Sequence, residues 1–291
     1  MKNFLLASRP KTLLASIIPP LMSFIYTTKI GFDVSLILVV CCVLSALCIQ
    51  LATNFFNDLI DNQKGADNVR HGPLRVTSAG LVAPTTIKYW SYSSLIFAAL
   101  FAIPLIQKAG FIILIPGLLS LYLSYGYTGG PYPLAYKGLG ETFVFLFFGV
   151  FSVVGSFYIY TSQFSFPVLM LSFIYGFLTM TLICVNNLRD RIEDQKVNKL
   201  TLATKVTEKT YIVFTLCSIF LPYLFIFEFT SLIKSWPMII SFFLALKLSK
   251  IILTEKLEKL NLGLKFGGLH LILFSLSFSI IIFYENLFPS I

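Results

Sequence analysis

The chain has 291 residues, of which 57% are hydrophobic and 12% charged, and its mean hydropathy is +0.85. This composition excludes an ordinary soluble domain, in which about 25% of residues are charged, and predicts a membrane protein. A formal net charge of +9 would also fit a nucleic-acid-binding protein. Because lysine and arginine accumulate in the cytoplasmic loops of membrane proteins, we expect a lipid bilayer and no nucleic acid as partner.

Nine stretches of the chain are apolar over the length of about 20 residues that crosses a bilayer. In chain order they cover residues 13–30, 34–56, 88–107, 110–127, 142–161, 165–186, 209–229, 235–250 and 266–284. The eighth is the weakest, because Pro237 and Lys247 shorten it. The pattern predicts an all-α membrane protein with nine transmembrane helices, built as a single polytopic domain over residues 1–291.

The positions of lysine and arginine predict the orientation of these helices. With the N-terminus inside, roughly 19 of the 22 basic residues lie on the cytoplasmic side, leaving Lys29, Lys108 and Lys234 outside. The C-terminus then lies outside. We expect a multi-pass protein of the cytoplasmic (inner) membrane, with loops at about 58–87, 128–141 and 188–208 facing the cytoplasm.

Acidic and amide side chains follow the second and the sixth span, at the start of two of these loops. They are Asn54, Asn57, Asp58 and Asp61 in the first cluster, and Asn187, Asp190 and Asp194 in the second. Spacings of three, four and seven residues place side chains on one face of a helix. Because magnesium is usually held by one or two carboxylates together with substrate phosphates, two facing clusters predict a metal-bridged diphosphate site.

Basic residues follow the acids in both loops, and they would contact the phosphate oxygens that a metal leaves exposed. The candidates are Lys64, Arg70, Arg75 and Lys196, with Lys137 from the glycine- and proline-rich third loop. That third loop could alternatively be only a turn. A single Asp-x-x-x-Asp would fit solvated residues at a membrane interface equally well, but two matched clusters on one side of the membrane favour a functional site.

These clusters resemble the UbiA superfamily of intramembrane aromatic prenyltransferases, through Asn57-x-x-x-Asp61 and Asp190-x-x-x-Asp194. Further segments resemble its 1,4-dihydroxy-2-naphthoate polyprenyltransferase (MenA) branch: SRPKT at 8–12, ND-x-x-D-x-x-KG-x-D at 57–67, GPLR at 72–75, YTGGPYPL at 127–134, GLGE at 138–141 and NLRD at 187–190. The resemblance covers about residues 8–205, and the last three helices match only in hydropathy. Many relatives carry a third acid where this chain has Gly65, and either Asp67 or Asp58 could replace it.

The resemblance implies a central cytoplasm-facing cavity that binds a polyprenyl diphosphate, with the tail toward lipid. It implies two Mg²⁺ ions, and the expected metal ligands are Asn57, Asp58, Asp61, Asn187, Asp190 and Asp194. Among them Asp61, Asp190 and Asp194 are the expected catalytic acids. The expected diphosphate-binding residues are Lys64, Lys137, Lys196, Arg70 and Arg75.

The implied reaction is magnesium-dependent transfer of the polyprenyl group to 1,4-dihydroxy-2-naphthoate with loss of carbon dioxide, giving demethylmenaquinone in menaquinone biosynthesis. Other acceptors served by related enzymes are 4-hydroxybenzoate, homogentisate, haem and glycerol phosphate, but the segments at 64–67 and 127–133 favour the naphthoate. A membrane transporter is a different alternative, because carriers use acids at the membrane midplane. The acids here lie at helix ends, which favours the enzyme.

Overall fold

A computed structural model describes residues 2–64, 72 and 74–287, and this part of the chain is helical without β-strands. Helix occurs in all nine predicted ranges. The long helices are α2 (Pro10–Lys29), α3 (Leu36–Gln63), α4 (Pro84–Ala109), α5 (Leu114–Gly126), α8 (Phe166–Arg189), α11 (Glu208–Phe225), α12 (Met238–Thr254) and α13 (Leu260–Leu287). The shorter ones include α1 (Lys2–Ser8), α6 (Gly140–Val144), the π-helix η3 (Phe145–Phe151), α7 (Ser152–Thr161), α9 (Arg191–Lys196) and α10 (Leu202–Lys205).

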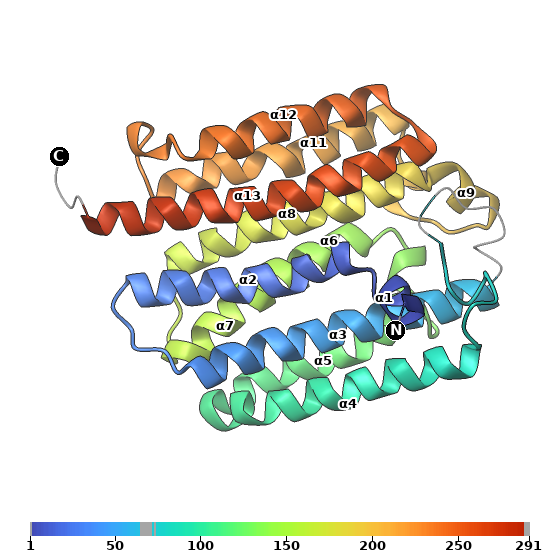
Figure 1. The fold of residues 1–291 in the computed structure, drawn as a ribbon, viewed down its shortest axis with the longest axis horizontal. Coiled ribbons are helices and arrows are strands. Elements are labelled where there is room, and N and C mark those ends of the chain that lie inside the picture. Colours follow the sequence, from blue (N-terminus) through green and yellow to red (C-terminus); the bar gives the residue numbers. More distant parts are fainter. Residues whose placement is uncertain (1, 65–71, 73, 288–291) are drawn as a thin grey trace.

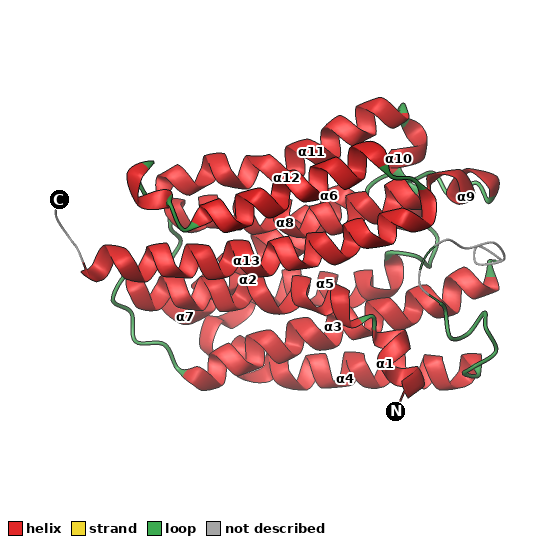
Figure 2. Ribbon diagram, turned by 45° about the horizontal axis from the view of Figure 1, so that its top comes forward, coloured by secondary structure: helices red, strands yellow, loops and turns green. Residues whose placement is uncertain are grey.

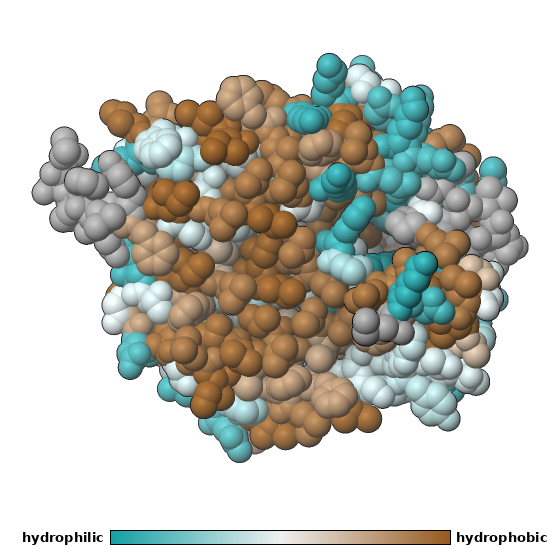
Figure 3. All heavy atoms as spheres, in the orientation of Figure 1, coloured by the Kyte–Doolittle hydropathy of each residue, from teal (hydrophilic) through white to brown (hydrophobic). Residues whose placement is uncertain are grey.

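By length and composition, six helical segments in the described residues could cross a membrane. They are Leu36–Gln63, Pro84–Gly126, Gly140–Thr161, Phe166–Arg189, Glu208–Glu228 and Leu257–Phe283. The number falls short of nine because Pro84–Gly126 contains two predicted spans, and because α2 and the 17-residue α12 are not among the six. The protein is therefore a multi-pass membrane protein, while the count of nine spans stays a prediction. Apolar residues cover the middle of the face in Figure 3, and polar residues gather toward the end that carries α9.

The long helices run side by side, with α3, α4 and α5 on one side, α11 and α12 on the other, and α2, α8 and α13 between them (Figure 1). The turn Gly110–Ile113 joins α4 to α5, and Gly110 takes a positive φ of 69° that favours glycine. Because the chain reverses at this turn, α5 lies against α3.

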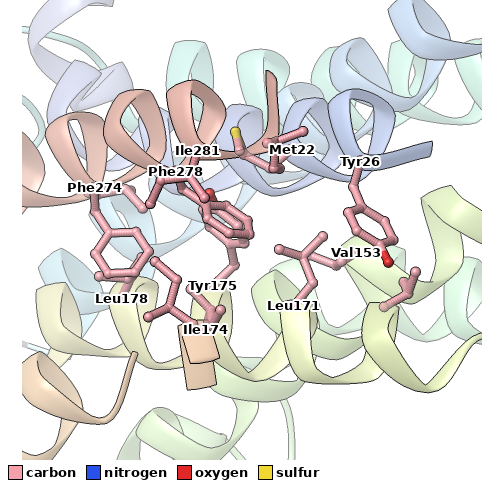
Figure 4. Close-up of a cluster of buried hydrophobic side chains, with 14 of the residues drawn as sticks. Met22, Tyr26, Val153, Leu171, Ile174, Tyr175, Leu178, Phe274, Phe278 and Ile281 are labelled. Carbon is pink, nitrogen blue, oxygen red and sulfur yellow. The ribbon is translucent and has the colours of Figure 1, made fainter. Parts of the chain in front are cut away.

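The largest cluster of buried apolar side chains joins α2, α7, α8 and α13 (Figure 4). Met22, Leu171 and Phe278 belong to it, and each is at most 3% exposed. Beside this cluster the backbones of η3 and α8 come very close, since a Cβ added to Gly149 would lie 2.5 Å from the Cα of Gly176. Small residues allow such approaches, and in a bilayer van der Waals packing of this kind stabilises helix association.

The C-terminal ends of α3 and α8 lie at the same end of the bundle, with α9 and the segment 74–83 beside them (Figures 1 and 2). These are the helix ends that carry the two acidic clusters. The helix packing therefore brings together two stretches that are about 130 residues apart in the chain.

Candidate active site

A cavity of about 1090 Å³ lies among the helices and reaches from this end deep into the bundle. Its lining includes both Asp61 in the last turns of α3 and Cys42 near the start of that helix. Nineteen residues at 1.5 Å each separate them by about 28 Å. The lining is polar near Asp61 and apolar further in, at Leu105, Ile113 and Ile159. This shape fits an amphiphilic ligand with a charged head and a long apolar tail.

The first cluster divides between two faces of α3. Asn57 and Asp61, four residues apart, both line the cavity. Asp58 is rotated away from them and does not line it. Its carboxylate, 1% exposed, accepts hydrogen bonds from the backbone N–H groups of Val76 and Thr77, each at 3.2 Å. Asp58 therefore holds the loop that follows α3, and the structure does not bring it to the predicted metal site.

Asp61 has two partners that hold its carboxylate in place. The Arg75 Nη2 atom donates to Oδ2 at 2.6 Å, and both side chains of this ion pair are almost fully buried. The hydroxyl of Tyr136 donates to Oδ1 at 3.1 Å. Asn57 is held separately, because the Thr128 hydroxyl donates to its side-chain oxygen. The predicted loops 58–87 and 128–141 thus meet at the end of α3.

The second cluster spans a break in the helix. Asp190 has backbone angles of φ −87° and ψ 4°, so that α8 ends at Arg189 and α9 begins at Arg191. Asn187, Asp190 and Asp194 nevertheless all line the cavity. Sequence periodicity predicted that these residues share one continuous helix face. They still share a face despite the break, because the Asp194 N–H donates to the Asp190 carbonyl at 2.8 Å, as in a helix.

Asp190 forms a fork with its neighbour Arg189, whose Nε and Nη2 atoms donate to the two carboxylate oxygens, both at 2.6 Å. Arg189 is fully buried and also bonds Asn186 at 2.7 Å and Asn261 of α13 at 2.8 Å. A bidentate guanidinium fixes the orientation of a carboxylate as well as neutralising its charge. The sequence alone did not single out Arg189 for this role.

Asp194 is paired with Lys199, whose Nζ lies 3.4 Å from Oδ1. Burial raises the pKa of Asp194 to about 6, although Lys199 acts in the opposite direction. Burial alone would lower the pKa of Lys199, but the carboxylates of Asp61 and Asp194 outweigh it, and the net shift is upward. Lys199 also lies over the ring of Tyr136, 5.6 Å from its centroid, which connects it to the Asp61 side of the site.

The basic residues around the cavity differ from those expected. Of the predicted diphosphate contacts, only Arg75 lines it, and Arg70 lies outside the described residues. Lys64 donates to the carbonyl of Thr128 at 2.8 Å, whereas Lys137 and Lys196 are exposed. The other basic residues that line the cavity are Lys199, Lys2, Arg9 and Lys11. The motif SRPKT at 8–12 is the sequence feature that could have indicated Arg9 and Lys11.

Oxygen atoms suitable for a hard cation surround the polar end. In the part of the chain that the structure describes, no three His, Cys, Asp or Glu side chains stand close enough to hold a metal by themselves. Asn57, Asp61, Asn187 and Asp194 line one space, however, and the Oδ2 atom of Asp194 is buried without a hydrogen-bond partner. This donor set fits Mg²⁺ that takes its remaining ligands from a phosphate group. Asp67 and Gly65, the positions in question for a third acid, lie outside the described residues.

Several known proteins are similar to this chain in sequence. Residues 16–259 match the family model described as the UbiA prenyltransferase family. The 1,4-dihydroxy-2-naphthoate octaprenyltransferase of Bacillus subtilis is 30% identical over 229 residues, covering 75% of this chain and 70% of that protein. The enzyme of the same name from Haemophilus influenzae is 32% identical over 215 residues, covering 68% and 67%.

Solved structures share the fold. A UbiA homologue from Archaeoglobus fulgidus bound to DMAPP and Mg²⁺ superposes with a TM-score of 0.67 at 16% identity, over 96% of this chain and 99% of that one. An apo UbiA homologue from Aeropyrum pernix gives 0.71 at 9% identity, over 95% and 98%. At these identities the structures show the fold, and the sequence matches confirm the resemblance drawn from the motifs. The chain belongs to the UbiA prenyltransferase family.

Proposed function

We propose that this protein transfers a polyprenyl group from a polyprenyl diphosphate to 1,4-dihydroxy-2-naphthoate, in menaquinone biosynthesis. The observation that carries the proposal is one cavity with Asp61 and Asp194 at its polar end and a long apolar interior. The names of the relatives at about 30% identity support the naphthoate as acceptor.

The polar end would hold the diphosphate head with Mg²⁺, which we expect as two ions. The ligands would come from Asn57, Asp61, Asn187, Asp190 and Asp194. The carboxylate of Asp190 would also keep its hydrogen bond from Arg189. Bound there, Mg²⁺ would offset the charge that develops on the leaving diphosphate. The Mg²⁺ bound in a homologous structure supports the use of this metal. Arg75 and Lys199, which already lie beside the carboxylates, are the best placed bases for the phosphate oxygens.

The rest of the cavity would bind the allylic chain and exclude water. In the reaction the C–O bond to diphosphate breaks with its electron pair on oxygen, and the ring carbon that bears the carboxylate bonds to the allylic carbon. The bond to the carboxylate then breaks, releasing carbon dioxide and returning its electrons to the ring, which gives demethylmenaquinol, the reduced form of demethylmenaquinone. Phe143, Phe147 and Phe151 line the cavity and contact one another at ring-centroid distances of 5.7 and 4.9 Å. Aromatic faces stabilise a cation that water cannot reach.

The proposed orientation places the polar end and the N-terminus in the cytoplasm and the C-terminus outside, in the inner membrane with nine spans. The support is the bias of lysine and arginine toward one side. Both substrates of the reaction are charged at one end, so a site that opens to the cytoplasm would receive the naphthoate from water and the prenyl chain from lipid.

The test is an assay of the purified protein with 1,4-dihydroxy-2-naphthoate and polyprenyl diphosphates of several lengths, with and without Mg²⁺. We expect diphosphate release and a decarboxylated, prenylated product only when both substrates and Mg²⁺ are present. The variants D61N and D194N should lose the product. D33N provides a matched control, because Asp33 is exposed at the opposite end of the bundle.

Two results would overturn the proposal in different ways. A prenylated product with 4-hydroxybenzoate or homogentisate but not with the naphthoate would reassign the acceptor. Solute transport in liposomes, with no diphosphate release under any condition, would show that the protein is a carrier and would overturn the prenyltransferase proposal.

A further inference from the structure

Glu141 is a buried acid outside the cavity, and none of the roles described above uses it. It lies in the first turn of α6 and is 1% exposed. Among the described residues no lysine or arginine forms an ion pair with it, and its Oε2 atom is buried without a hydrogen-bond partner. An acid in such a position in a membrane protein is costly and points to a function.

The carboxylate of Glu141 contacts the second cluster through a single oxygen. The Asn187 Nδ2 atom donates to Oε1 at 2.8 Å, and the hydroxyl of Tyr211 donates to the same atom. Tyr211 belongs to α11 and is fully buried. One oxygen atom therefore joins three helices, α6, α8 and α11, directly behind the cavity wall.

This contact determines which end of the Asn187 amide faces the cavity. A primary amide carries donors on its nitrogen and an acceptor on its oxygen, and only the oxygen can bind a cation. Because Glu141 Oε1 accepts from the nitrogen, the amide oxygen of Asn187 is left for the cavity that this residue lines. Without Glu141, the amide could rotate and present its N–H₂ group to the metal.

We propose that Glu141 is a positioning residue that keeps the Asn187 carbonyl oxygen directed into the active site, with Tyr211 as its brace. The inference rests on the proposed function, since it gives Asn187 the part of a metal ligand. Groups that orient metal ligands typically change metal affinity by about 10- to 100-fold when they are removed.

The test measures binding of Mn²⁺ in the presence of inorganic pyrophosphate by electron paramagnetic resonance, so that no turnover is needed. We expect E141L to weaken Mn²⁺ binding by about 10- to 100-fold. E141Q keeps an acceptor oxygen for both donors and should retain most of the affinity. Y211F should have a smaller effect than E141L. Y223F is its matched control, because Tyr223 is another hydrogen-bonded tyrosine of α11 that bonds Ser241 and His270 away from the site.

A double-mutant cycle with N187L separates positioning from a general structural effect. If Glu141 acts through Asn187, then E141L should add little to the loss caused by N187L alone. Equal losses from E141L in both backgrounds would overturn the inference, as would wild-type affinity in a folded E141L protein. Absence of saturable Mn²⁺ binding in the wild type, together with absence of prenyl transfer, would instead overturn the proposed function.

Discussion

Replacing Asp61 by asparagine should damage the protein in two ways that can be separated. Asp61 and Arg75 form an ion pair at 2.6 Å, with side chains 5% and 6% exposed. At an effective dielectric constant of about 20, Coulomb's law gives such a pair about 6 kcal/mol, before the desolvation of both charges is subtracted. Removing one charge of a buried pair typically costs about 3–5 kcal/mol. The amide of D61N keeps one acceptor oxygen for Arg75, and its nitrogen can donate to the Tyr136 hydroxyl, so we expect D61N to lower the free energy of unfolding by about 3 kcal/mol.

The double variant D61N/R75M removes the charge that D61N leaves behind, and should recover most of that loss, since apolar replacement of buried pairs is often neutral. Thermal unfolding in detergent measures the stability, and product formation measures the activity. Prenyl transfer should stay absent in both variants, because neither restores the carboxylate. Wild-type stability in D61N, or renewed transfer in the double variant, would refute this reasoning.

Further predictions follow from the second cluster and from helix packing. Burial raises the pKa of Asp194 to about 6, so its carboxylate takes up a proton as the pH falls through that value. The Mg²⁺ concentration for half-maximal rate should therefore rise as the pH is lowered from about 7 to about 5. A Mg²⁺ requirement that does not change with pH would contradict this prediction. K199M should raise the KM for the prenyl diphosphate by about tenfold or more, which is the effect of losing one charge-assisted hydrogen bond. K196M is the control and should leave the KM unchanged, because Lys196 is exposed. Equal effects of the two variants would contradict the assignment of Lys199 to the diphosphate. G149V should lower the unfolding temperature markedly, because the new Cβ would lie 2.5 Å from the backbone of α8. G268A is the control and should leave the unfolding temperature unchanged, because no atom lies within 4 Å of its new Cβ.

The first acidic cluster shows what helical periodicity can predict. The spacing of Asn57 and Asp61 placed both on one face of α3, and the structure puts both in the cavity. Asp58 lies three residues before Asp61, so the same periodicity also placed it near that face, and its exclusion from the cavity could not be read from the sequence. Its actual partners, the N–H groups at 76 and 77, depend on how the following loop folds back.

The basic residues show where sequence reasoning ends. Lys196 and Lys199 are both close to Asp194 in the chain, and periodicity favoured neither. The chain leaves α9 after Lys196, and Asn198 takes a positive φ of 54°, which turns Lys199 back onto Asp194. Arg9 lines the cavity although it precedes the first predicted span. Such contacts are set by loop conformation and helix packing, about which a hydropathy pattern carries no information.

Three carboxylates at the polar end already have a basic partner each, and this constrains what the substrate can bring. Asp61 is paired with Arg75, Asp190 with Arg189 and Asp194 with Lys199. A triply negative diphosphate entering alone would add an excess of negative charge to this buried environment, whereas the same diphosphate with Mg²⁺ is close to neutral. Under the proposed function Mg²⁺ would therefore bind the carboxylates, and Arg75 and Lys199 would instead donate hydrogen bonds to the phosphate oxygens. Arg189 differs, because it is fully buried and bonds two asparagines as well, so it should keep Asp190 oriented throughout the reaction.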